Sequence, residues 1–191
     1  MTQQQLEGMD LFYGKARCAT CRAGALQTDH NFYAIGLPQI GPGKNSGAAY
    51  AVSGLGMVTG EEADMYRFRI PSLRNVAQTG PYGHNGAYAP LEDMVRHHLD
   101  PVRGLARCYR GMATLSDGLD ADDRQVMEDF DEVMRIAEAI EIPDVNLDEV
   151  EIDRIMSFLK AVTDEGAGKR GLGVPTSVPS GLPMDRVAPP S

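Results

Sequence analysis

Two cysteines separated by two residues are the most informative chemical feature of this chain. Residues 18–22 read Cys-Ala-Thr-Cys-Arg. A pair at this spacing, when a histidine follows directly, is typical of covalent haem c attachment, with the histidine on the iron. Here the following residue is Arg22, whose guanidinium has N–H donors and no lone pair for a metal. The pair Cys18 and Cys21 therefore indicates haem attachment, while position 22 lacks the usual iron ligand.

The same spacing also fits a redox disulfide or half of a zinc site. A zinc site would need a second close pair, and the remaining cysteine, Cys108, is distant in the sequence. A redox dithiol of the thioredoxin type would need a βαβ pattern, which this sequence does not contain. Cys108 is most simply a small buried apolar residue.

A histidine on an apolar helix face is the second candidate for metal chemistry. A helix is predicted from Pro90 to Asp100, because proline is favoured at a helix start and Asp-Pro ends it. Four of its residues share one face, at offsets of 0, 3, 4 and 7: Leu91, Met94, Val95 and His98. We predict that His98 points into the core and that His97 is turned about 100° away. A core histidine held only by hydrogen bonds is the alternative for His98.

The elements that would position these residues are predicted to be helices joined by long loops. Besides 90–100, helices are predicted over 3–15, 121–140 and 146–162. The expected buried stripe of the third helix is Val126, Phe130, Val133, Met134 and Ala137. The last helix is expected to begin at an Asn146 N-cap, with a Glu149 capping box and a staple between Val145 and Val150. The fold class is therefore mostly α.

Residues 24–60 are rich in glycine and are predicted to form a long ordered loop. Such a length is unusual in a compact domain unless the loop surrounds something, and a cofactor would explain it. The domain is expected to cover residues 1–165, with a Gly/Pro/Ser-rich tail over 166–191.

Charge and composition exclude several classes of function. The net charge of −9 argues against nucleic-acid binding. No apolar run approaches the roughly 20 residues that span a bilayer, and any export signal is expected outside these residues. The sequence has no Gly-rich phosphate loop, serine nucleophile elbow or paired catalytic carboxylates. The acidic residues crowded between 117 and 153 favour a solvated helical surface over a docking face for a basic partner.

Six blocks of the sequence resemble, in the same order, the C-terminal electron-transfer haem domain of bacterial di-haem cytochrome c peroxidases and their MauG-like relatives. They are residues 8–12 before the cysteine pair, then 27–32, 67–76, 79–86, 91–98 and 178–183. The resemblance implies a cytochrome-c-like helical domain in the periplasm, with a haem protein or peroxidase domain as redox partner. It also implies haem c bound to Cys18 and Cys21, with His98 as distal iron ligand. Thr79 and Pro81 match positions whose carbonyls help to bind calcium between two domains.

The sequence departs from this family in two places that matter for function. Arg22 replaces the proximal histidine, and the domain with the peroxidatic haem is absent, so peroxide reduction by this chain alone is not expected. The leading hypothesis is a haem c-binding electron-transfer domain. The alternative is a haem-free binding subunit that keeps the fold, in which Arg22 pairs with an acid or an anion. A third hypothesis is a single Arg22 substitution in an otherwise ordinary haem domain.

Overall fold

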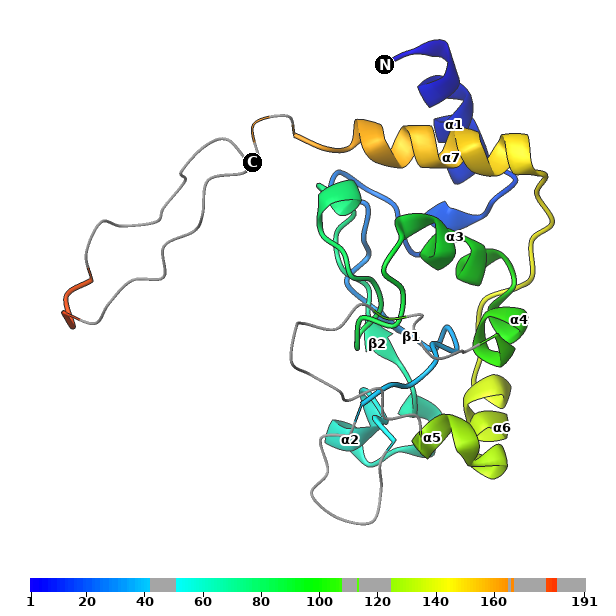
Figure 1. The fold of residues 1–191 in the computed structure, drawn as a ribbon, viewed down its shortest axis with the longest axis vertical. Coiled ribbons are helices and arrows are strands. Elements are labelled where there is room, and N and C mark those ends of the chain that lie inside the picture. Colours follow the sequence, from blue (N-terminus) through cyan, green and yellow to red (C-terminus); the bar gives the residue numbers. More distant parts are fainter. Residues whose placement is uncertain (42–50, 108–112, 114–124, 165, 167–177, 182–191) are drawn as a thin grey trace.

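Helices carry most of the regular structure in the part of the chain that the computed structural model describes, residues 1–41, 51–107, 113, 125–164, 166 and 178–181. The mostly α class is therefore confirmed (Figure 1). The α-helices are α1 (Gln3–Tyr13), α2 (Gly56–Thr59), α3 (Leu91–Leu99), α4 (Pro101–Ala106), α5 (Gln125–Glu128), α6 (Phe130–Glu138) and α7 (Glu149–Ala161). Three 3-10 turns are η1 (Cys18–Thr20), η2 (Glu62–Asp64) and η3 (Val76–Gln78).

The sheet is minimal. Strand β1 (Phe32–Tyr33) pairs antiparallel with β2 (Phe68–Arg69), with Phe32 opposite Arg69. The described parts of segment 24–60 contain only β1 and the single turn of α2, as predicted for a long loop. None of the helices in the described residues is both long and apolar enough to cross a membrane.

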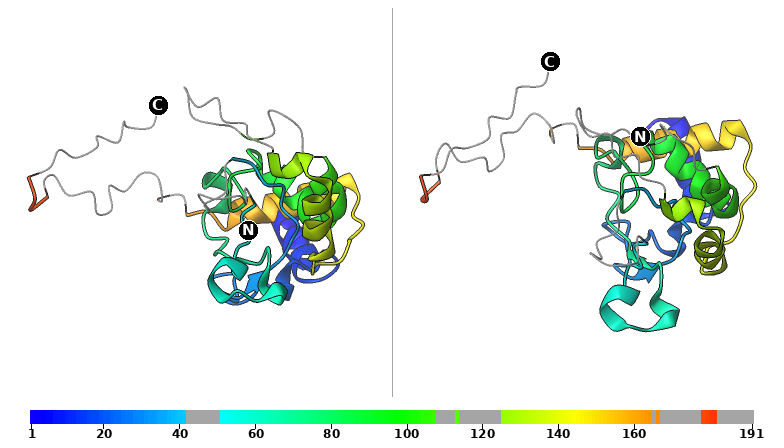
Figure 2. Two further views of the ribbon diagram at one scale, coloured as in Figure 1. Left: turned by 90° about the horizontal axis from the view of Figure 1, so that it is seen from below. Right: turned by 60° about the horizontal axis from the view of Figure 1, so that its bottom comes forward.

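Helices α1 and α7 cross in close contact, and the crossing forms the largest packing interface of the fold (Figures 1 and 2). The backbones approach so closely at Gly8 that a Cβ there would lie 1.9 Å from the Arg154 carbonyl oxygen. Beside this point Phe12 packs on Phe158, with ring centroids 5.2 Å apart. Glycine at position 8 is therefore a condition for the crossing, because any side chain would meet backbone.

The helices predicted over 3–15 and 90–100 are present, with Tyr13 and Leu99 as their last helical residues. Helix α1 begins after a capping box between Thr2 and Gln5 and ends at Gly14. Helix α3 begins after Pro90, which is its N-cap rather than its first helical residue, and ends at Asp100. The side chain of Asp100 then caps α4 by accepting from the Arg103 N–H.

The predicted third helix is interrupted, and its predicted stripe is wrong in part. Residues 121–124 lie outside the described residues, and Asp129 is extended, with its carboxylate accepting from the Glu132 N–H. Asp129 therefore separates α5 from α6, so the buried face of α6 does not continue the buried face of α5. Phe130 is consequently 74% exposed and Met134 is also exposed, whereas Ile136 is buried.

The predicted start of the last helix is also wrong, by two residues. The N-cap is Asp148, whose carboxylate accepts from the Glu151 N–H in a capping box, and Val150 is exposed rather than part of a staple. The extended segment before it lets the Val145 N–H donate to the Leu99 carbonyl at 2.8 Å. Cys108 and most of the predicted tail lie outside the described residues, so the domain boundary at 165 stays a prediction.

The substitution Gly8→Ala is expected to destabilise the fold, although alanine is the better helix former by about 1 kcal/mol. The added methyl would meet the Arg154 carbonyl, and such overpacking costs about 1–3 kcal/mol. Urea denaturation followed by circular dichroism measures the difference. Gln4→Ala, on the exposed face of the same helix, is the control and should leave the midpoint unchanged or slightly raised. An unchanged midpoint in Gly8→Ala would contradict the close crossing.

Candidate functional site

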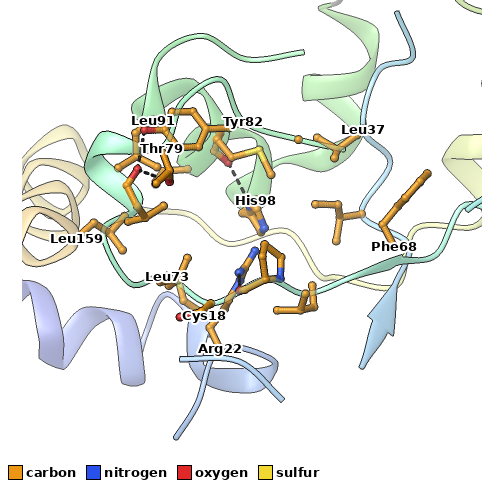
Figure 3. A pocket seen from close by; sticks show the side chains of 18 of the residues that line it. Cys18, Arg22, Leu37, Phe68, Leu73, Thr79, Tyr82, Leu91, His98 and Leu159 are labelled. Atoms are coloured by element: carbon orange, nitrogen blue, oxygen red, sulfur yellow. Dashed lines mark hydrogen bonds between the residues drawn. The ribbon is translucent and has the colours of Figure 1, made fainter. Parts of the chain in front are cut away.

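A cavity of about 350 Å³ lies between the α1–α7 pair, α3 and the segments that follow β1 and β2 (Figure 3). Its volume is in the range of small-molecule and cofactor sites, roughly 300–1,000 Å³. Most of its wall is apolar and includes Leu37, Leu73, Val76, Leu91, Val95 and Leu159. The wall draws on segments from both ends of the chain, so the α1–α7 crossing holds part of it in place.

Three of the residues singled out in the sequence line this cavity together: Cys18, Arg22 and His98. Cys18 opens η1, Arg22 follows the turn, and His98 comes from the other side on α3 (Figure 3). Leu91, Met94 and Val95 line the cavity with His98, which confirms the shared helix face. Cys21 is 8% exposed and is not part of the cavity wall. Both thiols are free rather than joined in a disulfide.

His98 is held in one tautomer. Its Nδ1 lies 2.8 Å from the Met94 carbonyl oxygen, and because a carbonyl only accepts, Nδ1 carries the proton. Burial, and secondarily the positive charge of Arg22, lower the pKa of His98 to about 4. The imidazole is therefore neutral near pH 7, with a lone pair left on Nε2. A backbone bond of this kind at one ring nitrogen is how metal-binding histidines are usually oriented.

Arg22 faces His98 from across the cavity (Figure 3). The side chain is buried, with 9% of its surface exposed, and Nη1 donates to the Pro71 carbonyl. No carboxylate of the described residues forms an ion pair with it. Burial lowers the pKa of Arg22 below its usual value, but a guanidinium stays protonated in proteins. The cavity thus contains a buried positive charge without a counter-ion from these residues.

The two thiols are not of the reactive type. Burial raises the pKa of Cys18 to about 12, with the neighbouring Cys21 adding to the effect and Arg22 opposing it. Burial also raises the pKa of Cys21, against the effect of Arg22. Reactive dithiols have lowered pKa values, so this environment does not favour the redox-disulfide hypothesis.

His97 has a structural role that the sequence did not reveal. It is turned away from the cavity, as predicted, but it is 1% exposed in the interior. Its Nε2 donates to the Ile35 carbonyl at 2.7 Å, so its Nδ1 accepts from the Tyr88 hydroxyl at 2.9 Å. Gly104 packs directly on the ring, where a Cβ would lie 2.1 Å from Nδ1. These contacts fix the C-terminal turn of α3 and so orient His98.

Two aromatic rings within the blocks 67–76 and 79–86, neither of them predicted as a site residue, also form part of the wall. Phe68 and His84 stack with centroids 3.7 Å apart, and both line the cavity. No alternation signal marks Phe68, because the consecutive residues 68–72 all line the cavity. The stack joins two segments that are 16 residues apart in the sequence.

Thr79 and Pro81, predicted as at most half of a calcium site, both line the cavity, and Pro81 is joined to Gly80 by a cis peptide bond. The Thr79 hydroxyl donates to the Val76 carbonyl at 3.3 Å. Within the described ranges, no three His, Cys, Asp or Glu side chains are grouped closely enough to hold a metal. Calcium binding through backbone carbonyls stays a prediction.

The donor set decides whether the cavity suits a haem. An apolar wall, a thiol at the wall and a neutral histidine with a free Nε2 are among the groups that bind haem c, whereas the second thiol, Cys21, is not part of the wall. Arg22 can give hydrogen bonds but no electron pair to iron. The residues present therefore fit a haem with one protein ligand on the iron, His98, and none from position 22.

Comparison of sequences relates the chain to bacterial peroxidases. No protein-family model matches it. It is 34% identical to a cytochrome-c peroxidase of Pseudomonas sp. (strain SCT), over 48% of this chain and 30% of that protein. It is 37% identical to the cytochrome c551 peroxidase of Nitrosomonas europaea, over 50% of this chain and 27% of that protein. MauG of Methylorubrum extorquens, a methylamine utilization protein, is 35% identical over 48% of this chain and 24% of its own length.

Solved structures extend the similarity to most of the chain. A MauG-like protein associated with microbial copper homeostasis superposes with a TM-score of 0.61 and 28% identity, over 87% of this chain and 48% of that chain. The di-haem peroxidase BthA of Burkholderia thailandensis, in a variant form, shares the fold with a TM-score of 0.55 and 20% identity. This chain covers 43% of that protein. The chain is thus related to the cytochrome-c peroxidase and MauG proteins and spans less than half the length of these relatives.

The buried neutral state of His97 predicts that the protein loses stability in mild acid. Its pKa of about 4 lies below the value near 6.5 of an unfolded histidine, so between these values only the unfolded chain takes up the proton. The contribution of His97 is complete above pH 6.5 and falls by roughly 3 kcal/mol as the pH drops to 4, and His98, whose pKa is also lowered to about 4, adds to the loss. Urea denaturation at intervals across this range measures the loss.

His97→Gln supplies the comparison. It should be less stable than the wild type at pH 7 but lose less stability between pH 6.5 and 4. His30→Asn, at an exposed histidine, should keep the wild-type pH dependence. Equal slopes in the wild type and His97→Gln would refute this origin of the acid sensitivity.

Proposed function

We propose that this chain is a haem c-binding electron-transfer domain, with Cys18 and Cys21 attaching the macrocycle and His98 as the axial ligand of the iron. The observation that carries the proposal is the position of His98. A neutral imidazole with a free Nε2 faces the cysteine-bearing turn across an apolar cavity. The similarity to proteins named cytochrome-c peroxidase, MauG and di-haem peroxidase supports the same cofactor.

Haem in this cavity would supply a centre for reversible one-electron transfer. The protein residues act on it in three ways. The Met94 carbonyl orients the His98 ring and keeps Nε2 available. The apolar wall excludes water from the cofactor, which affects its redox potential. Cys18 stands at the wall as an attachment point, and Cys21 must turn its sulfur toward the cavity to form the second thioether.

The proposed redox partner is a haem protein or a peroxidase domain, because the relatives named peroxidase are more than twice as long as the region they share with this chain. Peroxide reduction is therefore assigned to such a partner and not to this chain alone. Haem c attachment in bacteria occurs outside the cytoplasm, and we place the protein in the periplasm on that ground. Thr79 and Pro81 would contribute carbonyls to a calcium ion shared with the partner.

A haem-free binding subunit is the second candidate, and the buried charge of Arg22 is the observation that favours it. A maturation system that requires histidine after the second cysteine would leave the thiols free, and Arg22 would then bind an anion in an empty cavity. The two candidates differ in colour, in covalent mass and in the stability of the empty protein.

Covalent haem is expected when the protein is exported in a host with cytochrome c maturation enzymes. A pyridine haemochrome assay should give about one haem per chain, because one cysteine pair is present. Cys18→Ser/Cys21→Ser should lose the covalent haem, and Arg22→His should raise its yield. Folded, colourless wild-type protein would favour the haem-free alternative, and colour restored by Arg22→His would point to a single substitution in an otherwise ordinary haem domain.

His98→Ala is expected to keep the covalent haem and change the absorption spectrum of the iron. Attachment depends on the thiols, whereas the axial ligand depends on the His98 Nε2. His30→Asn, at an exposed histidine, is the matched control and should have the wild-type spectrum. Identical spectra for His98→Ala and wild type would remove His98 from the iron.

A further inference from the structure

Most N–H donors of the Arg22 guanidinium form no hydrogen bond with the described residues. Nη1 donates to the Pro71 carbonyl, and no other hydrogen bond joins the Arg22 side chain to the described residues. The carboxylate of Asp29, which acts on Arg22 electrostatically, accepts instead from the Tyr33 hydroxyl at 2.7 Å and from Asn31. The remaining N–H groups are directed toward the cavity and His98 (Figure 3).

The surroundings of this charge favour an anion. The facing His98 is neutral, the Cys18 thiol is protonated, and none of the described acidic residues lines the cavity. A buried charge without a partner costs several kcal/mol, and an apolar wall strengthens its attraction for an opposite charge. Arg69, the other basic residue at the cavity, is exposed and lies toward solvent. Arg22 is thus the buried positive group of this cavity within the described part of the chain.

We propose that Arg22 makes the iron face opposite His98 a binding site for a small inorganic anion, an inference that rests on the proposed haem function. Position 22 supplies hydrogen-bond donors and no electron pair, so that face of a bound haem iron would be open. An anion on the iron would accept charge-assisted hydrogen bonds from the guanidinium and neutralise its buried charge. The domain would then bind ligands as well as transfer electrons.

Azide titration of the ferric haem protein, followed by absorbance, tests this site. Wild type should bind azide, and Arg22→Gln should bind it about ten- to hundredfold more weakly, because a charge-assisted hydrogen bond is lost. Arg22→Lys, which keeps the charge, should lie between the two. Arg22→His should close the site with a second protein ligand and abolish azide binding. Haem content and circular dichroism establish that each variant is folded and loaded.

Two controls separate direct contact from general charge effects. Arg69→Gln removes an exposed charge at the same cavity and should change the azide affinity by less than about threefold. Carbon monoxide, which is uncharged, should bind the ferrous forms of wild type and Arg22→Gln with affinities within about threefold. A loss of carbon monoxide affinity equal to the loss of azide affinity would overturn the charge-based contact.

The outcomes distinguish this inference from the function on which it rests. Wild-type protein without haem in the haemochrome assay overturns both. Haem-containing protein that does not bind azide, or binds it equally well in wild type and Arg22→Gln, overturns the anion site alone and leaves the haem function standing.

Discussion

The close crossing of α1 and α7 at Gly8 is the contact on which the rest of the structure depends. It brings Phe12 of α1 against Ile155 and Leu159 of α7, and these three side chains are both core and cavity wall. Because η1 follows α1 after a short turn, the same contact determines where Cys18 stands relative to the cavity. The same residues therefore determine both the packing of the core and the geometry of the site, and a shift of α1 or α7 would alter both.

The adjacent histidines of α3 have different roles: His97 supports the structure, and His98 faces the cavity. Both ring nitrogens of His97 form hydrogen bonds inside the protein. Because a buried polar group with all its hydrogen bonds made is held rigidly, His97 anchors the end of α3. His98, one step around the helix, uses only Nδ1 and keeps Nε2 for the cavity. The helix turn of about 100° per residue is what gives neighbours of the same type such different environments.

Local sequence signals predicted the helices that carry the site. The break in the third helix and the side-chain positions of Cys21 and Arg22 depend on tertiary contacts, which local signals do not contain. The capped ends of α1 and α3 and the shared face of Leu91 and His98 follow from short-range patterns. The cap at Asp129 could not be predicted, because an uninterrupted apolar stripe was equally compatible with residues 121–140. Nor does any spacing rule reveal that Cys21 is not part of the cavity wall or that the Arg22 side chain donates to the distant Pro71 carbonyl.

The contact between Gly104 and the His97 ring has a consequence for how this chain can change over time. A Cβ at position 104 would overlap the imidazole, so a larger residue there is compatible only with a smaller one at 97. The two sites form a coupled pair across the α3–α4 junction, in which neither substitution is neutral until the other has occurred. Substitution of Gly104 is therefore restricted by the His97 side chain, which does not line the cavity.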